Sequence, residues 1–153
     1  MHQEKWKIYE AYLIYALLSN YDQEELTSFG TQKIDNFKVH KFLNEIYVFN
    51  KDKKEMNVSI LIIQILFYLH KDQYDAIIDR INPLRLYADR HLRSKETYRS
   101  KQFIKMLAVM EEQGFDYAST KDKSMKYFNK LKSAEMKHEN ENHENLEIIP
   151  YEH

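Results

Sequence analysis

Glycine and proline are scarce in this chain, which contains only two of each among 153 residues. Sandwiches and barrels need many tight turns, and these two residues supply the backbone angles that most turn types require. The scarcity therefore favours long helices over an all-β fold. Hydrophobic residues make up 43 % of the chain, which is enough for a domain with a real core.

Apolar residues recur at helical spacing along most of the chain. The pattern predicts six helices, over residues 4–19, 32–48, 53–70, 73–92, 95–113 and 120–132. In the first helix, Trp6, Tyr9, Leu13 and Ala16 form the expected inner stripe, which Ile8, Tyr12 and Tyr15 widen. The third helix carries an apolar run from Val58 to Leu69, interrupted only by Ser59 and Gln64. That run is too short to span a bilayer, so we expect a helix buried on most sides.

Short polar motifs set the expected helix boundaries. We expect Asp52-x-x-Glu55 to open the third helix, with N-caps at Asp72 and Ser94 and a further start at Ser119-x-x-Asp122. Gly114 stands where a C-terminal cap requires positive φ. Pro83 removes an amide donor inside the fourth helix and predicts a kink or break near Asn82.

The six helices fall into three pairs with a period of roughly 40 to 50 residues, which is within the range of solenoid repeats. The expected fold is all-α, a right-handed array of about three antiparallel helical hairpins over residues 1–133. A compact six-helix bundle satisfies the same pattern. Residues 134–153 are expected to form a loose acidic tail, in which 135–153 contain six glutamates and one lysine. The closing "LEIIPYEH" turns apolar again, so we expect it to dock on the body or to begin something absent from this chain.

The stretch "LIIQILFYLHKDQYDAIIDRI" resembles the middle of a tetratricopeptide-type repeat. Tyr74 matches the aromatic residue after the turn, Ala76 or Ile77 the next position, and Ile81 and Leu84 the later apolar ones. The glycine typical of the first helix is absent, Ile65 is bulkier than the family residue, and the spacing is longer. Residues 40–151, through "KFLNEI", "KDKKEMNVSILIIQILF", "FIKML" and "EIIPYE", are also similar to a group of uncharacterised bacterial helical-repeat proteins. The resemblance implies a TPR-like α-solenoid, here its C-terminal portion, that binds partners on a curved surface.

The leading hypothesis is therefore a non-catalytic module that binds a protein or peptide, with no cofactor. Its concave side would use aromatic and basic residues of the inner helices. These residues are Trp6, Tyr9, Tyr12, Tyr15, Tyr98, Lys101 and Lys105.

A basic stretch supports an alternative function, because binding to nucleic-acid phosphates requires several cations on one surface. All five arginines lie in it: Arg80, Arg85, Arg90, Arg93 and Arg99. Tyr87 and Tyr98 would offer stacking faces for bases. The competing interpretation is an ordinary solvated helix face with salt bridges.

The sequence motifs give little evidence for an active site or a metal site. Arg85 with His91 resembles the signature of an all-helical ribonuclease superfamily, but six residues rotate the helix by roughly 240° and separate the two side chains. His138 and His143 in "HENENHE" are five apart, which does not fit a zinc-binding helix. The chain has no cysteine and no signal-peptide pattern, so we expect a cytoplasmic protein without disulfides or a metal site.

Overall fold

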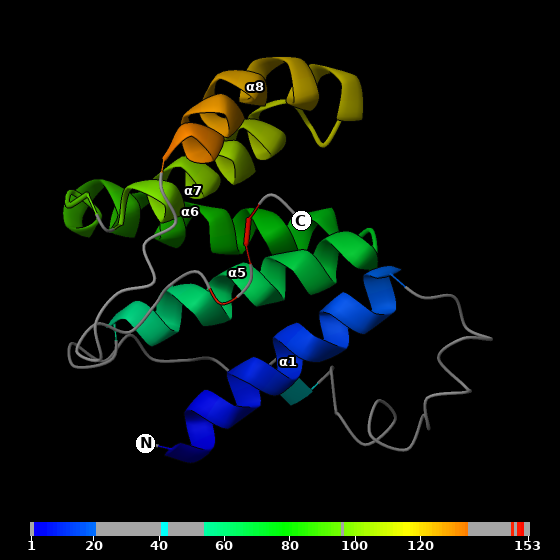
Figure 1. Cartoon of the computed structure of the whole chain (residues 1–153). Coiled ribbons are helices and arrows are strands. Elements are labelled where there is room, and N and C mark those ends of the chain that lie inside the picture. Colours follow the sequence, from blue (N-terminus) through cyan, green and yellow to red (C-terminus); the bar gives the residue numbers. More distant parts are fainter. Residues whose placement is uncertain are drawn as a thin grey trace. The chain divides into compact units, whose positions relative to one another are not determined.

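The computed structural model describes residues 2–20, 41–42, 54–95, 97–134, 148 and 150–151. Within these ranges every regular element is a helix, which confirms the all-α prediction for the described residues (Figure 1). The helices are α1 (His2–Asn20), α5 (Lys54–His70), α6 (Tyr74–His91), α7 (Tyr98–Glu112) and α8 (Tyr117–Ser133). Lys41 and Phe42 are helical, and the remainder of the predicted 32–48 helix lies outside the described residues, as do Asp52 and the tail residues 135–147.

The chain divides into two compact units, Met1–Asp72 with α1 and α5, and Gln73–His153 with α6, α7 and α8. The predicted helical domain of residues 1–133 includes helices from both units. Each unit has its own packing.

In the first unit, α1 packs against the strongly apolar α5. The prediction of a buried helix is confirmed, because Val58, Ile62 and Ile63 of α5 are completely buried. The two polar residues in its apolar run, Ser59 and Gln64, are also buried. The hydrogen bonds there are made by the Tyr12 hydroxyl and the Gln64 side chain. The Tyr12 hydroxyl donates to the Ser59 carbonyl at 3.1 Å, and the Gln64 side-chain amide donates to the Phe42 carbonyl at 3.2 Å. Burial of these polar groups is tolerated because their hydrogen bonds are made inside the protein.

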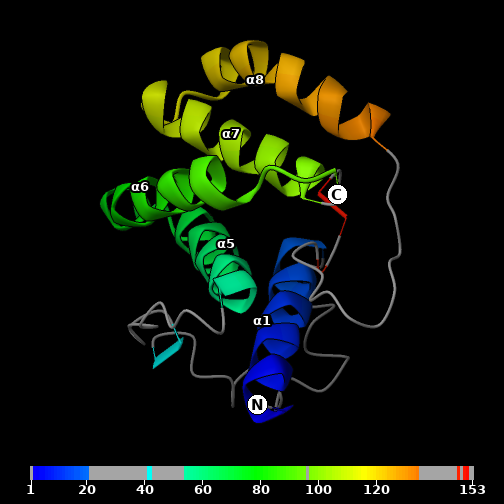
Figure 2. The same ribbon diagram turned by 90° about the vertical axis from the view of Figure 1, so that its left-hand side faces the viewer.

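In the second unit, α7 packs against both α6 and α8 and lies between them (Figure 2). Side chains from all three helices form the core and are at most 1 % exposed: Ile77, Ile81 and Leu84 from α6, Ile104 from α7, and Leu131 from α8. Burial of this kind stabilises a domain by about 1.5–3 kcal/mol per large aliphatic side chain. The three-helix arrangement therefore has a core of its own.

Helix α6 continues through Pro83 from Tyr74 to His91, so the helix does not break near Asn82, where the sequence predicts a kink or break. Pro83 and Asp79 are both exposed. Because the Asp79 carbonyl loses its helical donor on the solvent side, water can replace that donor, and the helix survives its proline.

The turn before α6 contradicts the predicted cap at Asp72. The amides of Lys71 and Asp72 donate to the carbonyls of Tyr68 and Leu69, and Asp72 has φ 54°. Aspartate is one of the few side chains that visit this left-handed region readily, and here it ends α5. Gln73 precedes α6 and makes no side-chain cap hydrogen bond.

The starts of α7 and α8 also differ from prediction. Helix α7 begins at Tyr98, and Ser94 accepts the Thr97 amide at 3.3 Å in the preceding turn without capping α7 itself. Helix α8 begins at Tyr117, because the Asp116 side chain caps it by accepting the Ser119 amide. The helix starts predicted at Ser94 and at Ser119 are therefore wrong.

The C-terminal cap predicted at Gly114 is confirmed. Gly114 has φ 59°, its amide donates to Glu111, and the Phe115 amide donates to Met110. These two bonds form a Schellman motif that satisfies the last carbonyls of α7. Phe115 is also left-handed, with φ 62°, and its ring stacks on Tyr74 with centroids 4.5 Å apart.

Candidate interaction surfaces

Helix α1 is apolar on two opposite faces. Ile8, Ala11 and Tyr12 are buried on one side, whereas Trp6, Tyr9 and Leu13 are exposed on the other by 70 %, 48 % and 61 %. The exposed three residues, called the α1 aromatic face below, have i, i+3, i+7 spacing and lie within about 60° of one another around the helix. The rings of Trp6 and Tyr9 are in edge-to-face contact with centroids 6.2 Å apart. Their mutual contact limits the freedom of both side chains.

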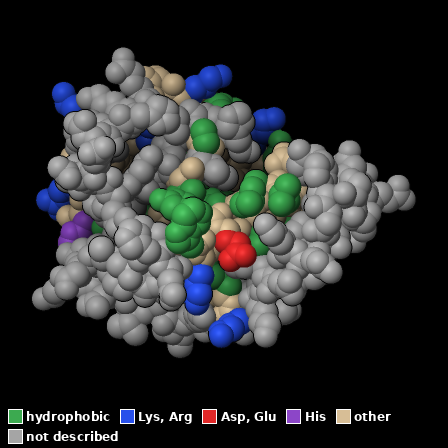
Figure 3. All heavy atoms as spheres, turned by 60° about the horizontal axis from the view of Figure 1, so that its bottom comes forward, with side chains coloured by type: hydrophobic (Ala, Val, Ile, Leu, Met, Phe, Trp, Pro, Cys, Tyr) green, Lys and Arg blue, Asp and Glu red, His purple; other side chains and the backbone are tan. Residues whose placement is uncertain are grey.

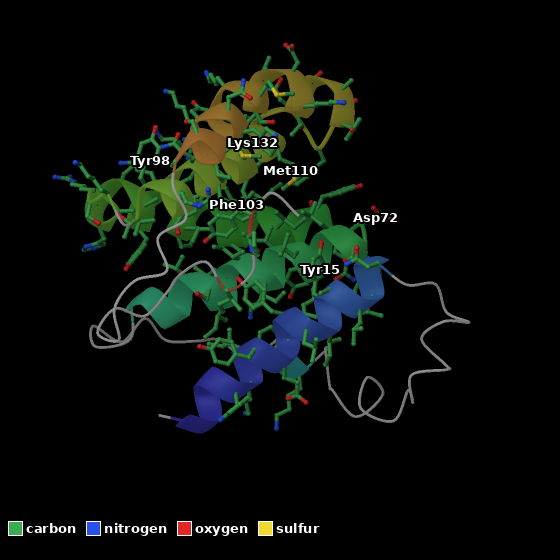
Figure 4. All side chains as sticks on the ribbon, viewed as in Figure 1. Tyr15, Asp72, Tyr98, Phe103, Met110 and Lys132 are labelled. Carbon is green, nitrogen blue, oxygen red and sulfur yellow. The ribbon has the colours of Figure 1, made fainter. Side chains whose placement is uncertain are left out.

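Two of the four residues predicted as a partner-binding stripe on this helix face the other way. Tyr12 is hydrogen-bonded inside the first unit, and Tyr15 projects toward α5, where its ring meets Phe67 at 5.7 Å (Figure 4). The stripe expected to be internal, with Trp6, Tyr9 and Leu13, is the exposed one. Leu13 was therefore missed as a surface residue, although its spacing from Tyr9 indicated the shared face.

The space-filling view of the side that carries α1 shows hydrophobic side chains beside acidic and basic ones (Figure 3). Lys7 and Glu10, which lie in sequence between members of the α1 aromatic face, are exposed. Exposed apolar side chains beside charged ones are typical of a protein interaction site.

The basic stretch does not form one uniform cationic surface. Arg80 donates to the Ala76 carbonyl at 2.8 Å, Arg85 pairs with Glu112 at 3.3 Å, and Arg93 donates to the Asp89 carbonyl at 3.2 Å. Arg85, Arg90 and Arg93 are exposed, and Arg80 is half-buried.

Arg99 is a buried residue of the second unit that contacts the end of α8. It is only 6 % exposed, and its Nη1 donates to the carbonyls of Leu131 and Ala134 at 2.9 and 3.0 Å. These carbonyls stand at the C-terminal end of α8, where a cation is favoured by the helix dipole and by unsatisfied acceptors. Arg99 therefore holds the end of α8 and offers no exposed cation to a phosphate.

Helix α8 carries a set of cations that the sequence interpretation overlooked. All five of its lysines are exposed, and the helix has one acidic residue, Asp122. Tyr117 is 76 % exposed, and Lys121 lies over its ring at 5.7 Å. In the sequence, only the high proportion of lysine within Tyr117–Ser133 indicates this set of cations. The lysines are Lys121, Lys123, Lys126, Lys130 and Lys132.

The second predicted group of partner-binding residues lies on α7. Figure 4 labels Tyr98 and Phe103 on this helix and Lys132 on α8. Tyr98 is exposed and Lys101 is half-buried. The Lys105 ammonium lies 5.6 Å from the Tyr127 ring centroid, which is a cation–π distance. These residues belong to the second unit, whereas Trp6 and Tyr9 belong to the first.

The Arg85 and His91 pair, which resembles a ribonuclease signature, has other neighbours in the structure. Arg85 pairs with Glu112, and the His91 ring lies 4.9 Å from that of Tyr87. Because α6 is continuous between them, the rotation of roughly 240° still separates Arg85 from His91. No group of three histidine, aspartate or glutamate side chains in the described part of the chain is placed to hold a metal ion. His138 and His143 lie outside the described residues.

The length and hydropathy of the helices bear on membrane insertion. Among the described residues, none of the helices is both long enough and apolar enough to cross a bilayer.

Comparison with known proteins found no match for this chain. No protein-family model matches the chain, and neither a curated protein nor a solved structure matches it.

Proposed function

We propose that this chain is a non-catalytic helical module that binds a protein partner through the α1 aromatic face. The supporting observation is that Trp6, Tyr9 and Leu13 remain exposed while the opposite side of the same helix is buried. A helix that needed only to pack on α5 would carry polar residues at these positions. Aromatic side chains are enriched at interfaces, because they bury a large area at a low cost in conformational entropy.

The spacing of the α1 aromatic face indicates the shape of the partner. Side chains at i, i+3 and i+7 form a ridge, and helical ridges of this kind insert into apolar grooves. The partner is therefore a protein with an apolar groove, and α1 supplies the inserted helix.

We also propose that the helices form a TPR-like array of hairpins. Support comes from the three pairs of helices that the sequence predicts and from the packing of α7 against α6 and α8. In such an array each pair buries its stripe against the next one, and the remaining outer faces are available to partners.

Affinity capture from the native cell tests the binding role with a matched pair of variants. Leu13→Ser removes an apolar side chain from the α1 aromatic face. Leu86→Ser removes a leucine of similar exposure, 55 % against 61 %, from α6. A protein retained by the wild type and by Leu86→Ser, but lost with Leu13→Ser and with Trp6→Ser, supports the proposal. A protein retained equally by all of these chains would contradict it.

A second candidate function is nucleic-acid binding, which the exposed lysines of α8 favour. Residues 73–134 contain thirteen Lys and Arg against eight Asp and Glu, so this region carries a positive excess. Contacts with phosphates release counterions, so affinity should fall steeply as salt increases.

The nucleic-acid test compares two charge-reversal pairs on labelled single-stranded RNA and duplex DNA. Lys126→Glu with Lys130→Glu should weaken binding strongly and reduce the salt dependence by about two phosphate contacts. Arg90→Glu with Arg93→Glu tests the basic stretch in the same way. An absence of binding by the wild type at low salt would eliminate this function.

A further inference from the structure

Tyr151, in the closing stretch "LEIIPYEH" that is expected to dock on the body or to begin something absent from this chain, contacts α7. The ring of Tyr151 stacks on Phe103 with centroids 4.2 Å apart and planes inclined by 3°. The hydroxyl groups of Tyr151 and Ser100 are within hydrogen-bond distance at 3.1 Å. Figure 2 draws the described C-terminal residues in red beside α7.

Tyr151 contacts both Ser100 and Phe103 because these two residues are three positions apart on α7. Side chains at this spacing are neighbours on the helix surface. Phe103 offers an apolar ring face, and Ser100 offers a polar atom one turn away. A phenol ring is complementary to this pair, since its body is apolar and its far end donates and accepts hydrogen bonds.

The docked residues are peripheral to the core of the unit that holds them. Ile77, Ile81, Leu84, Ile104 and Leu131 are buried at 1 % exposure or less, and all of them come from α6, α7 and α8. Phe103 and Tyr151 are half-buried, and so are Ile148 and Pro150. Tyr151 therefore lies at the edge of a core that α6, α7 and α8 form without it. Its position resembles that of a bound ligand.

We propose that the face of α7 with Ser100 and Phe103 is a binding site for a short Pro-Tyr peptide, occupied in cis by Tyr151 of the same chain. Proline at position 150 restricts the backbone before the tyrosine, which lowers the entropic cost of docking. Because the peptide belongs to the same chain, its docking is intramolecular, and a free peptide of the same chemistry must compete with it. This inference is independent of the α1 aromatic face.

Peptide titration of the full-length chain tests the site. A fluorescently labelled peptide of residues 146–153, LEIIPYEH, is titrated with the wild type and with Tyr151→Ala, and its anisotropy is measured. The variant has an empty site and should bind the peptide, whereas the wild type should bind it at least about tenfold more weakly. Adding Phe103→Ala to the Tyr151→Ala chain should abolish binding.

Peptide variants separate the two contacts. A peptide with phenylalanine at the tyrosine position keeps the stack and loses the hydroxyl bond, so its affinity should fall by about two- to tenfold. A peptide with alanine there should not bind. If Tyr151→Ala lost its helical circular dichroism, Tyr151→Leu would take its place, because leucine keeps apolar bulk without stacking. Equal binding to the wild type and the emptied chain, equal binding of the alanine peptide, or no binding at all would overturn the proposal.

Discussion

Asp116 shows how one carboxylate starts a helix. Its Oδ1 accepts the Ser119 amide at 2.9 Å, at the end of α8 where four amides lack helical acceptors. The pKa of Asp116 lies below 3.8, because the backbone amide and then the hydroxyl of Ser119 bond to the charged form, while burial opposes the shift weakly. The charged carboxylate is also favoured by the positive end of the helix dipole.

We expect Asp116→Ala to lower the thermal midpoint of the chain at neutral pH. Because the folded pKa is depressed, the stabilisation is complete above the unfolded value of 3.8 and is lost as pH falls through the folded pKa. The wild type and the alanine variant should therefore converge in acid. Thermal unfolding followed by circular dichroism between neutral pH and about pH 2 measures this convergence.

Asp116→Asn is the matched control, because asparagine caps as well as aspartate but has no carboxylate to titrate. At neutral pH the midpoint of Asp116→Asn should lie between those of the wild type and Asp116→Ala, and its difference from Asp116→Ala should not change through the pH range in which Asp116 titrates. A difference between aspartate and alanine that stayed constant into acid would contradict the role of the charge.

Arg99 is the residue whose role is least evident from its neighbours in sequence. It stands in the basic stretch, where Arg90 and Arg93 are exposed, but it is itself buried. It donates hydrogen bonds to two carbonyls at the end of α8. We expect Arg99→Met to lower the free energy of unfolding by about 2 to 3 kcal/mol, because charged hydrogen bonds are lost and acceptors remain unpaired. Urea denaturation measures this loss, and Arg93→Met, at an exposed arginine, should change stability by no more than about 0.5 kcal/mol. Equal losses for the two variants would show that Arg99 does not hold α8.

At the scale of elements, the two faces of α1 give a direct comparison between adjacent residues. Ile14 is 3 % exposed and Leu13 is 61 % exposed. Ile14→Ala should cost about 2–5 kcal/mol of unfolding free energy, since it removes buried methyl groups and leaves a cavity. Leu13→Ala should change it by no more than about 0.5 kcal/mol, which chemical denaturation of both variants can measure. A large loss at Leu13 would mean that the α1 aromatic face packs inside the protein.

The turn between α7 and α8 depends on one left-handed glycine. A Cβ added to Gly114 would meet nothing within 4 Å, so a substitution there is opposed by the backbone angle alone. We expect Gly114→Ala to lower the free energy of unfolding by about 1–2 kcal/mol. Gly114→Asn should cost less, because asparagine tolerates this region. Equal costs for alanine and asparagine in urea denaturation would argue against backbone strain as the cause.

At the scale of the whole molecule, Trp6 is the single tryptophan of the chain and reports on the α1 aromatic face. Because its side chain is 70 % exposed, its fluorescence should be centred near that of a hydrated indole. Quenching by acrylamide should be nearly the same in the folded and the urea-unfolded chain. A bound partner should shift the emission to shorter wavelength and reduce quenching. A strongly blue-shifted emission from the free chain would contradict an exposed Trp6.

The sequence by itself determined the helical character of the described residues, the burial of α5 and the cap at Gly114. These features follow from local causes: few turn residues, one long apolar run and one glycine that reaches positive φ. Tertiary structure decided which apolar face of α1 became core, because Trp6 and Tyr12 belong to stripes of comparable hydrophobicity and only the position of α5 distinguishes them. It also decided that Arg99 caps α8 and that Tyr151 docks on α7. Both contacts join residues more than thirty positions apart, and no local pattern specifies such a partner.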